Sequence, residues 1–189
     1  MSLPNALTAG RIVLTMALYV PAFSGDRALL LWGFVLAFVT DLLDGYLARR
    51  LGQTSYLGMR LDSLADYLLM VSGLVWAWWL EPGLFREHST IWASVAVAVA
   101  APQAICLFRV GKNAGFHLYS TKAAGWAAAV LFVHAVSSGS HSELLLYFFA
   151  LLVIVKSTEE TAICLLVPDP YKDLRPSALS YLLPPARRG

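Results

Sequence analysis

Long apolar runs are the feature that most constrains what this chain can fold into. An α-helix needs about 20 apolar residues to cross a bilayer, and six such helices with short connections would use most of the 189 residues. The runs lie at roughly 12–23, 28–48, 58–80, 91–108, 122–136 and 144–166. Only 14% of the residues are charged, against about 25% in an ordinary soluble domain. The sequence therefore predicts an all-α, polytopic membrane protein with six transmembrane helices.

The placement of the basic residues predicts the orientation of these helices. If the N-terminus is cytoplasmic, nearly all basic residues fall in cytoplasmic segments: Arg11, Arg49, Arg50, Arg60, Arg109, Lys112, Lys122, Lys172, Arg175, Arg187 and Arg188. Only Arg27 and Arg86 then lie outside, and Lys156 lies within the last span. Because cytoplasmic loops carry the excess of Lys and Arg, we expect both termini inside.

The chain is predicted to hold one membrane domain, residues 1–167, followed by an irregular, proline-rich cytoplasmic tail at 168–189. The first apolar run lacks a convincing signal-peptide cleavage site, so we expect it to stay as the first helix. Loop residues between 51 and 57 should separate helices two and three, and Glu81-Pro82-Gly83 should end the third.

The cysteines and histidines predict no special chemistry. Cys106 and Cys164 lie in apolar stretches without metal-like spacing, so they are expected to be reduced, buried thiols. The four histidines are scattered and predict no ligand pair.

Four aspartates carry the functional prediction. Asp41 and Asp44 are three residues apart, while Asp62 and Asp66 are four apart, so each pair projects from one face of its helix. A short loop should make these two helices antiparallel neighbours. We therefore expect all four carboxylates to face one another at the cytoplasmic end.

Four converging carboxylates in a membrane helix pair need positive charge. Each costs about 2.5–3.5 kcal/mol at the bilayer centre, and less near the interface. Arg49 and Arg60 are too few to balance them, whereas two Mg²⁺ or Mn²⁺ ions would suffice and suit hard oxygen ligands. Gly45, Ala48 and Gly58 would leave room for a ligand beside the acids, and Arg49 could bind a diphosphate. Alternatively, the acids form a solvated surface and the small residues only allow close helix packing.

These residues resemble a known signature. Asp41-x-x-Asp44-Gly45-x-x-Ala48-Arg49, followed after eight residues by Gly58-x-x-x-Asp62-x-x-x-Asp66, is similar to the signature of the CDP-alcohol phosphatidyltransferases at every specified position. The N-terminal Pro4-Asn5-x-Leu7-Thr8-x-x-Arg11 and the six-span plan also resemble this family.

The resemblance implies a homodimeric membrane enzyme, with no nucleic-acid partner, whose active site faces the cytoplasm of a bacterial plasma membrane. It would transfer a phosphatidyl group from CDP-diacylglycerol to a polar alcohol and release CMP. By this resemblance, Asp41, Asp44, Asp62 and Asp66 hold the metal ions, and Asp66 is also the general base. The CDP-lipid would be contacted by Pro4, Asn5, Ala6, Leu7, Gly45, Ala48, Arg49, Gly58 and the hydroxyl of Ser55 or Thr54.

The acceptor alcohol stays open. Arg109 and Lys122 resemble basic residues that receive the phosphate of glycerol phosphate or inositol phosphate, although they could simply be positive-inside anchors. Users of glycerol phosphate often read Asp-Pro-x-Ala-Asp-Lys where this chain has Ser63 and Tyr67 instead of proline and lysine. In the last span, Lys156 and Glu160 could neutralise each other or, with Glu159, line an acceptor pocket.

Two other functions compete with this interpretation. Intramembrane acids could form the relay of an ion or proton transporter, but that would not explain Gly45, Ala48, Arg49 and Gly58. The second competing function is that of a catalytically silent relative that only binds CDP-lipids, and the intact set of four aspartates argues against it.

Overall fold

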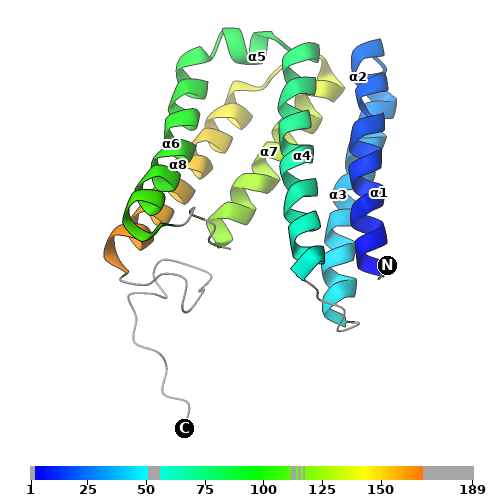
Figure 1. Cartoon of the computed structure of the whole chain (residues 1–189). Coiled ribbons are helices and arrows are strands. Elements are labelled where there is room, and N and C mark those ends of the chain that lie inside the picture. The colour runs from blue at the N-terminus through cyan, green and yellow to red at the C-terminus, as the bar shows by residue number, and fades with distance from the viewer. Residues whose placement is uncertain (1–2, 51–55, 112–113, 115, 117, 168–189) are drawn as a thin grey trace. The chain divides into compact units, whose positions relative to one another are not determined.

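The computed structural model describes residues 3–50, 56–111, 114, 116 and 118–167, which form helices joined by short turns and loops (Figure 1). Its helices are α1 (Leu3–Ala17), α2 (Tyr19–Ser24), α3 (Arg27–Arg50), α4 (Tyr56–Leu80), α5 (Gly83–Arg86), α6 (Ser89–Val110), α7 (Tyr119–Ser138) and α8 (Glu143–Leu166). The predicted all-α class is confirmed. The proline-rich tail at 168–189 lies outside the described residues.

Three helical stretches of the described chain are long and apolar enough to cross a membrane: Asn5–Ser24, Leu61–Leu80 and Ser89–Val110. Large apolar side chains also point outward on these and other helices, for example Val13, Trp32, Phe108 and Leu144. Such exposure is costly in water and inexpensive in lipid. The prediction of a membrane protein is supported to this extent, and membrane spans formed by α3, α7 and α8 stay a prediction.

Glycine and serine set several helix ends. Gly25 follows α2 at φ 79° and Gly111 follows α6 at φ 71°, a left-handed conformation that costs glycine little. The backbone N–H of each returns to a carbonyl of its own helix. Ser142 begins α8 by accepting a hydrogen bond from the backbone N–H of Leu145. Pro102 lies inside α6, which is common in membrane helices.

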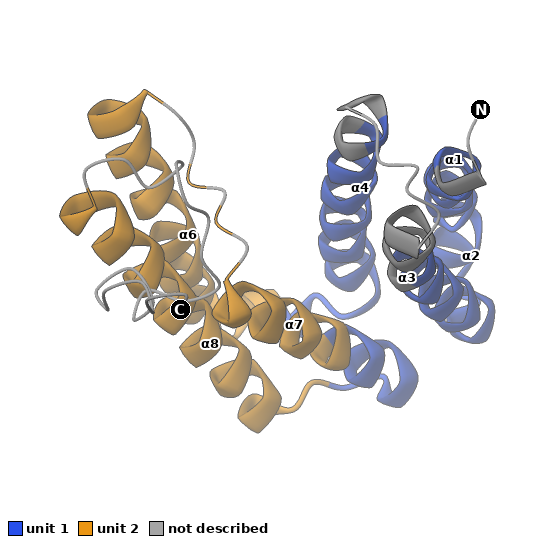
Figure 2. Ribbon diagram, turned by 90° about the horizontal axis from the view of Figure 1, so that it is seen from below, with its two compact units in different colours: residues 1–84, 132–140 blue, residues 85–131, 141–189 orange. Residues whose placement is uncertain are grey.

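The chain divides into two compact units, coloured separately in Figure 2. Unit 1 consists of residues 1–84 and 132–140, and unit 2 of residues 85–131 and 141–189.

Unit 1 is organised around α1, which packs against both α3 and α4. Asp41 of α3 and Asp62 and Asp66 of α4 bring their carboxylate oxygens within 4.8 Å of one another, so the prediction that the two helices face each other at the aspartates is confirmed for these three residues. The side chain of the fourth, Asp44, lies outside the described residues. The chain approaches itself closely at Gly33, where an added Cβ would overlap the side chain of Leu18, which lies between α1 and α2.

An aromatic cluster and the contacts of Arg27 hold unit 1 together away from the aspartates. Aromatic rings of Phe34 and Phe132 lie with their centroids 4.5 Å apart, and Trp76 is fully buried beside them. Arg27 contacts the Glu81 carboxylate at 2.7 Å and donates a hydrogen bond of 3.1 Å to the carbonyl of Val136. These contacts connect the α2–α3 turn to the end of α4 and to residues 132–140.

Unit 2 is built mainly on the packing of α6 against α8. Val95, Ala124, Ala150 and Val153 form one of its buried clusters. A disulfide joins Cys106 in α6 to Cys164 in α8, and both residues are fully buried. The prediction of two reduced thiols was therefore wrong: the residues lie 58 apart in the sequence, and only the packing of α6 on α8 brings them together.

Candidate active site

One face of α1 presents buried polar residues to the rest of unit 1. Thr8, Arg11 and Thr15 are three and four residues apart, so they share one side of the helix. All three are at least 96% buried, and Thr15 Oγ donates a hydrogen bond of 2.8 Å to the carbonyl of Arg11. This face carries Arg11 to the position between α3 and α4.

The Arg11 guanidinium contacts three of the four predicted aspartates. It forms an ion pair with Asp41 of α3, while its Nη2 lies 2.8 Å from Asp62 and its Nη1 lies 3.3 Å from Asp66, both of α4. The arginine side chain is fully buried, and the three carboxylates are between 33% and 55% exposed. The buried guanidinium charge of Arg11 thus lies beside three carboxylates that remain accessible.

The sequence named Arg49 and Arg60 as the basic residues near the aspartates, and the structure adds Arg11, which contacts three of the carboxylates. The side chains of Arg49 and Arg60 lie outside the described residues. The sequence did contain a sign that Arg11 is part of the site, since it is a basic residue at the start of an apolar run and belongs to the N-terminal signature. Its role depends on a contact across 51 residues of sequence, which no helical period predicts.

The three carboxylates fit a divalent cation. Asp41, Asp62 and Asp66 each offer an oxygen atom, and these atoms all lie within 4.8 Å of one another. Three negative charges and the one positive charge of Arg11 leave two negative charges, which one divalent ion would balance. Each carboxylate has a second oxygen besides the one facing Arg11, so guanidinium and metal can be bound together. Hard oxygen ligands of this kind suit Mg²⁺ or Mn²⁺.

The other predicted site residues are only partly described. Asp44, Gly45, Ala48 and Arg49 lie in α3 next to Asp41, but their side chains are outside the described part of the structure. Gly58 lies in the first turn of α4, one turn before Asp62, and Pro4 to Leu7 form the start of α1. Thr54 and Ser55 fall outside the described residues.

The family model for CDP-alcohol phosphatidyltransferases matches residues 1–158, which include the N-terminal segment and all four aspartates.

The chain belongs to the CDP-alcohol phosphatidyltransferase family.

Curated members of the family show partial similarity to this chain. It is 35% identical over 103 residues to the CDP-diacylglycerol–glycerol-3-phosphate 3-phosphatidyltransferase of Pseudomonas fluorescens, a match that covers 52% of this chain and 49% of the relative. The Haemophilus influenzae enzyme of the same name is 34% identical over 111 residues, covering 56% and 55%. The CMP-forming cardiolipin synthase of Streptomyces coelicolor is 35% identical over 119 residues, covering 59% and 51%. The matched part thus spans about half the length of these relatives. No solved structure matches the chain.

The residues predicted to select the acceptor lie in unit 2. Lys156 Nζ is 2.9 Å from the buried Glu160 carboxylate, which supports mutual neutralisation of this pair. Glu159 accepts a hydrogen bond of 2.5 Å from Ser120. Arg109 donates to the carbonyl of Cys164, and Lys122 is exposed. That Arg109 and Lys122 lie near the active site of this family member stays a prediction.

Proposed function

We propose that this CDP-alcohol phosphatidyltransferase transfers a phosphatidyl group from CDP-diacylglycerol to a polar alcohol and releases CMP. The observation that carries the proposal is the convergence of Asp41, Asp62 and Asp66 around Arg11 in a member of this family. The names of the relatives favour an acceptor with a glycerol phosphate group, either glycerol 3-phosphate or a phosphatidylglycerol headgroup.

Each residue of the cluster has a proposed role. Asp41, Asp44, Asp62 and Asp66 hold Mg²⁺ or Mn²⁺, which when bound would neutralise the diphosphate and the departing CMP. Asp66 has the most exposed side chain of the three described carboxylates and the longest of their contacts with Arg11, so it is the best placed to take a proton. Arg11 fixes the positions of the carboxylates on α3 and α4 from α1.

The reaction then balances as a substitution at phosphorus. Asp66 accepts the proton of the acceptor hydroxyl, and the hydroxyl oxygen forms a bond to the lipid-side phosphorus. The bond from that phosphorus to the CMP oxygen breaks, so the products are a phosphodiester lipid and CMP. Gly45, Ala48, Arg49, Gly58, Ser55 and the Pro4–Leu7 segment are proposed to hold the CDP-lipid. A site near the end of membrane helices would let the acyl chains remain in lipid while the nucleotide extends into water.

The proposed topology has six spans, formed by α1 with α2, α3, α4, α6, α7 and α8, with both termini in the cytoplasm of a bacterial plasma membrane. The asymmetry of the basic residues supports it. Reporter fusions to the C-terminus and to the segment containing Arg86 should be located on opposite sides of the membrane.

A homodimer is proposed from the family resemblance. The mass of the detergent-solubilised protein would show whether it contains two chains.

The test is CMP release by the purified full chain in detergent, with CDP-diacylglycerol, Mg²⁺ or Mn²⁺, and a panel of alcohols. The panel contains glycerol 3-phosphate, phosphatidylglycerol, inositol phosphate and serine, and mass spectrometry of the lipid product names the acceptor. A transporter or a silent lipid-binding relative would release no CMP with any of them.

The Asp66→Asn variant tests the proposed base. It removes the proton acceptor but keeps the size of the side chain, so we expect CMP release to fall by at least ~100-fold with little change in thermal stability. Asp26→Asn is the matched control, because Asp26 lies in the α2–α3 turn and accepts a hydrogen bond from the backbone N–H of Leu29. Substantial turnover by Asp66→Asn would exclude Asp66 as the base.

A further inference from the structure

A second group of metal-binding side chains lies in unit 2, outside the aspartate cluster. Glu87 and His88 lie between α5 and α6, with His88 at the residue immediately before α6. His141 lies two residues before the start of α8. The sequence predicted no pair among the scattered histidines, but the fold brings His88 and His141 together although 53 residues separate them.

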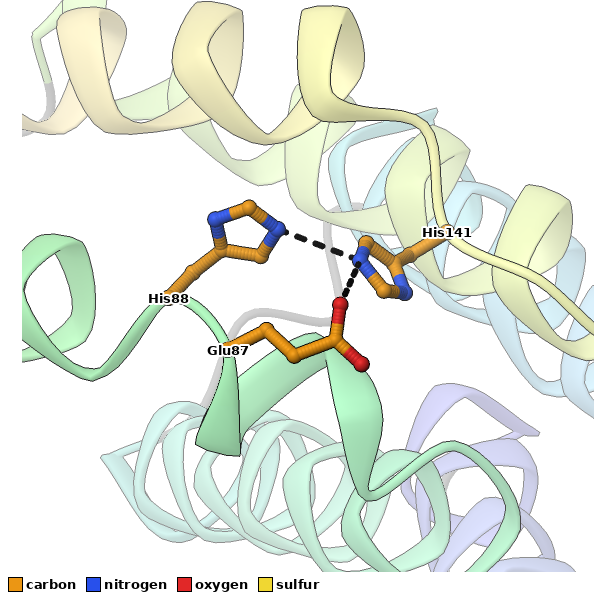
Figure 3. A group of neighbouring side chains, drawn as sticks. All are labelled: Glu87, His88 and His141. Carbon is orange, nitrogen blue, oxygen red and sulfur yellow. Dashed lines mark hydrogen bonds and ion pairs between the residues drawn. The ribbon is translucent and has the colours of Figure 1, made fainter.

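The ligand atoms of the three residues point toward one another (Figure 3). His88 Nε2 and His141 Nε2 are 3.1 Å apart, and the Glu87 carboxylate is 3.6 Å from the same nitrogen of His141. All three atoms lie within 4.8 Å of one another. The His141 side chain is 16% exposed and that of Glu87 is 67% exposed, so the group is supported on one side and open on the other.

Hydrogen bonds alone cannot satisfy all three groups at once. A neutral imidazole carries one N–H, so His141 Nε2 either donates or accepts, and it cannot do both. If it donates to the Glu87 carboxylate, it has no lone pair for His88, and if it accepts from His88 it turns a lone pair toward the carboxylate. A cation among the three atoms would interact favourably with the lone pairs of all of them.

The spacing agrees with a tetrahedral metal site. Zinc binds imidazole nitrogen at about 2.0–2.1 Å, which at the tetrahedral angle places two ligand atoms about 3.3–3.4 Å apart. The distances of 3.1 Å and 3.6 Å lie on either side of that value. Two imidazoles and one carboxylate favour Zn²⁺ or another late first-row divalent ion over Mg²⁺.

We propose that Glu87, His88 and His141 form a binding site for a divalent transition-metal ion, best matched by Zn²⁺, with water completing the coordination. The ion would connect the N-terminal ends of α6 and α8. The Cys106–Cys164 disulfide already links the same two helices near their C-terminal ends. The proposed metal would thus fix the second end of the main helix pair in unit 2. This site goes beyond the proposed transferase activity and does not depend on it.

The experiment measures Zn²⁺ binding to the full chain in detergent after removal of metals with a chelator. Excess Mg²⁺ is present throughout to occupy the oxygen ligands of the aspartate cluster. We expect one Zn²⁺ per chain to bind by isothermal titration calorimetry, and the X-ray absorption spectrum of the zinc to show two imidazole ligands. A spectrum without imidazole would overturn the assignment.

Variants give the sharper comparison. His88→Gln with His141→Gln should weaken Zn²⁺ binding by at least about 100-fold, since losing even an outer partner of a metal ligand commonly costs 10–100-fold. His134→Gln is the matched control, because this histidine lies in α7 outside the group and should leave binding unchanged. Glu87→Gln alters an exposed side chain with little risk to folding, and it should weaken binding by at least about 10-fold. Wild-type affinity in either the double variant or Glu87→Gln refutes the site.

Discussion

Arg11→Met is the most informative perturbation of unit 1, because one guanidinium contacts carboxylates from two helices. The substitution keeps a long, flexible side chain on α1 and removes its charge. Asp41, Asp62 and Asp66 would then face one another without the guanidinium that contacts all three. We expect the variant to be less stable than the wild type when divalent ions are absent, and to recover stability when they are added.

The magnitude follows from the contacts. A hydrogen bond to a charged group contributes about 1.5–3 kcal/mol, and breaking a fully buried ion pair costs about 3–5 kcal/mol. Here the arginine is fully buried but the carboxylates are 33–55% exposed, so water can recover part of the loss. We estimate a cost of about 2–4 kcal/mol for Arg11→Met. At about 2–4 °C per kcal/mol for a chain of this size, the apparent Tm should fall by about 5–15 °C.

The assay is thermal unfolding of the full chain in detergent, first with EDTA and then across a series of Mg²⁺ concentrations. The gap between wild type and Arg11→Met should narrow as Mg²⁺ rises, because a bound cation supplies the missing charge. Arg86→Met is the matched control, since Arg86 is exposed at the end of α5, and it should leave both the Tm and its Mg²⁺ dependence unchanged. An unchanged Tm for Arg11→Met in EDTA, or the same Mg²⁺ response as the wild type, would refute the argument.

Two further predictions concern packing. Replacing Cys106 and Cys164 by alanine should lower the apparent Tm by an amount that corresponds to the ~2–4 kcal/mol typical of a disulfide. The wild-type protein should resist alkylation by iodoacetamide until it is reduced. Immediate alkylation of both residues in the unreduced protein would contradict the disulfide. Gly33→Ala should be less stable than Gly73→Ala by about 1 kcal/mol, because an added Cβ at Gly33 would overlap the buried side chain of Leu18, which must move, whereas one at Gly73 meets nothing within 4 Å and should be neutral or slightly stabilising. Equal unfolding temperatures for the two glycine variants would show that the side chain of Leu18 moves aside without cost.

The helices themselves are largely determined by local sequence. Apolar runs bounded by glycine, proline and short polar loops predicted five of the six long helical segments to within three residues at each end. The first helix was predicted less well, because α1 already begins at Leu3, before the apolar run at 12–23, and the break between α1 and α2 and the short α5 were not predicted. The spacings of Asp41 to Asp44 and of Asp62 to Asp66 fixed which residues share a helix face. These features depend on residues three or four apart, and such distances are set by the helix period.

Three contacts were decided only by tertiary structure. Arg11 meets Asp62 across 51 residues, His88 meets His141 across 53, and Cys106 meets Cys164 across 58. Each depends on which helices pack together: α1 against both α3 and α4, and α6 against α8. The period of a helix places a side chain on a face but does not say which other helix that face will contact. The sequence alone therefore determined the helices and which acidic residues share a helix face, whereas packing decided that Arg11 lies among three of these acidic residues and which distant residues pair.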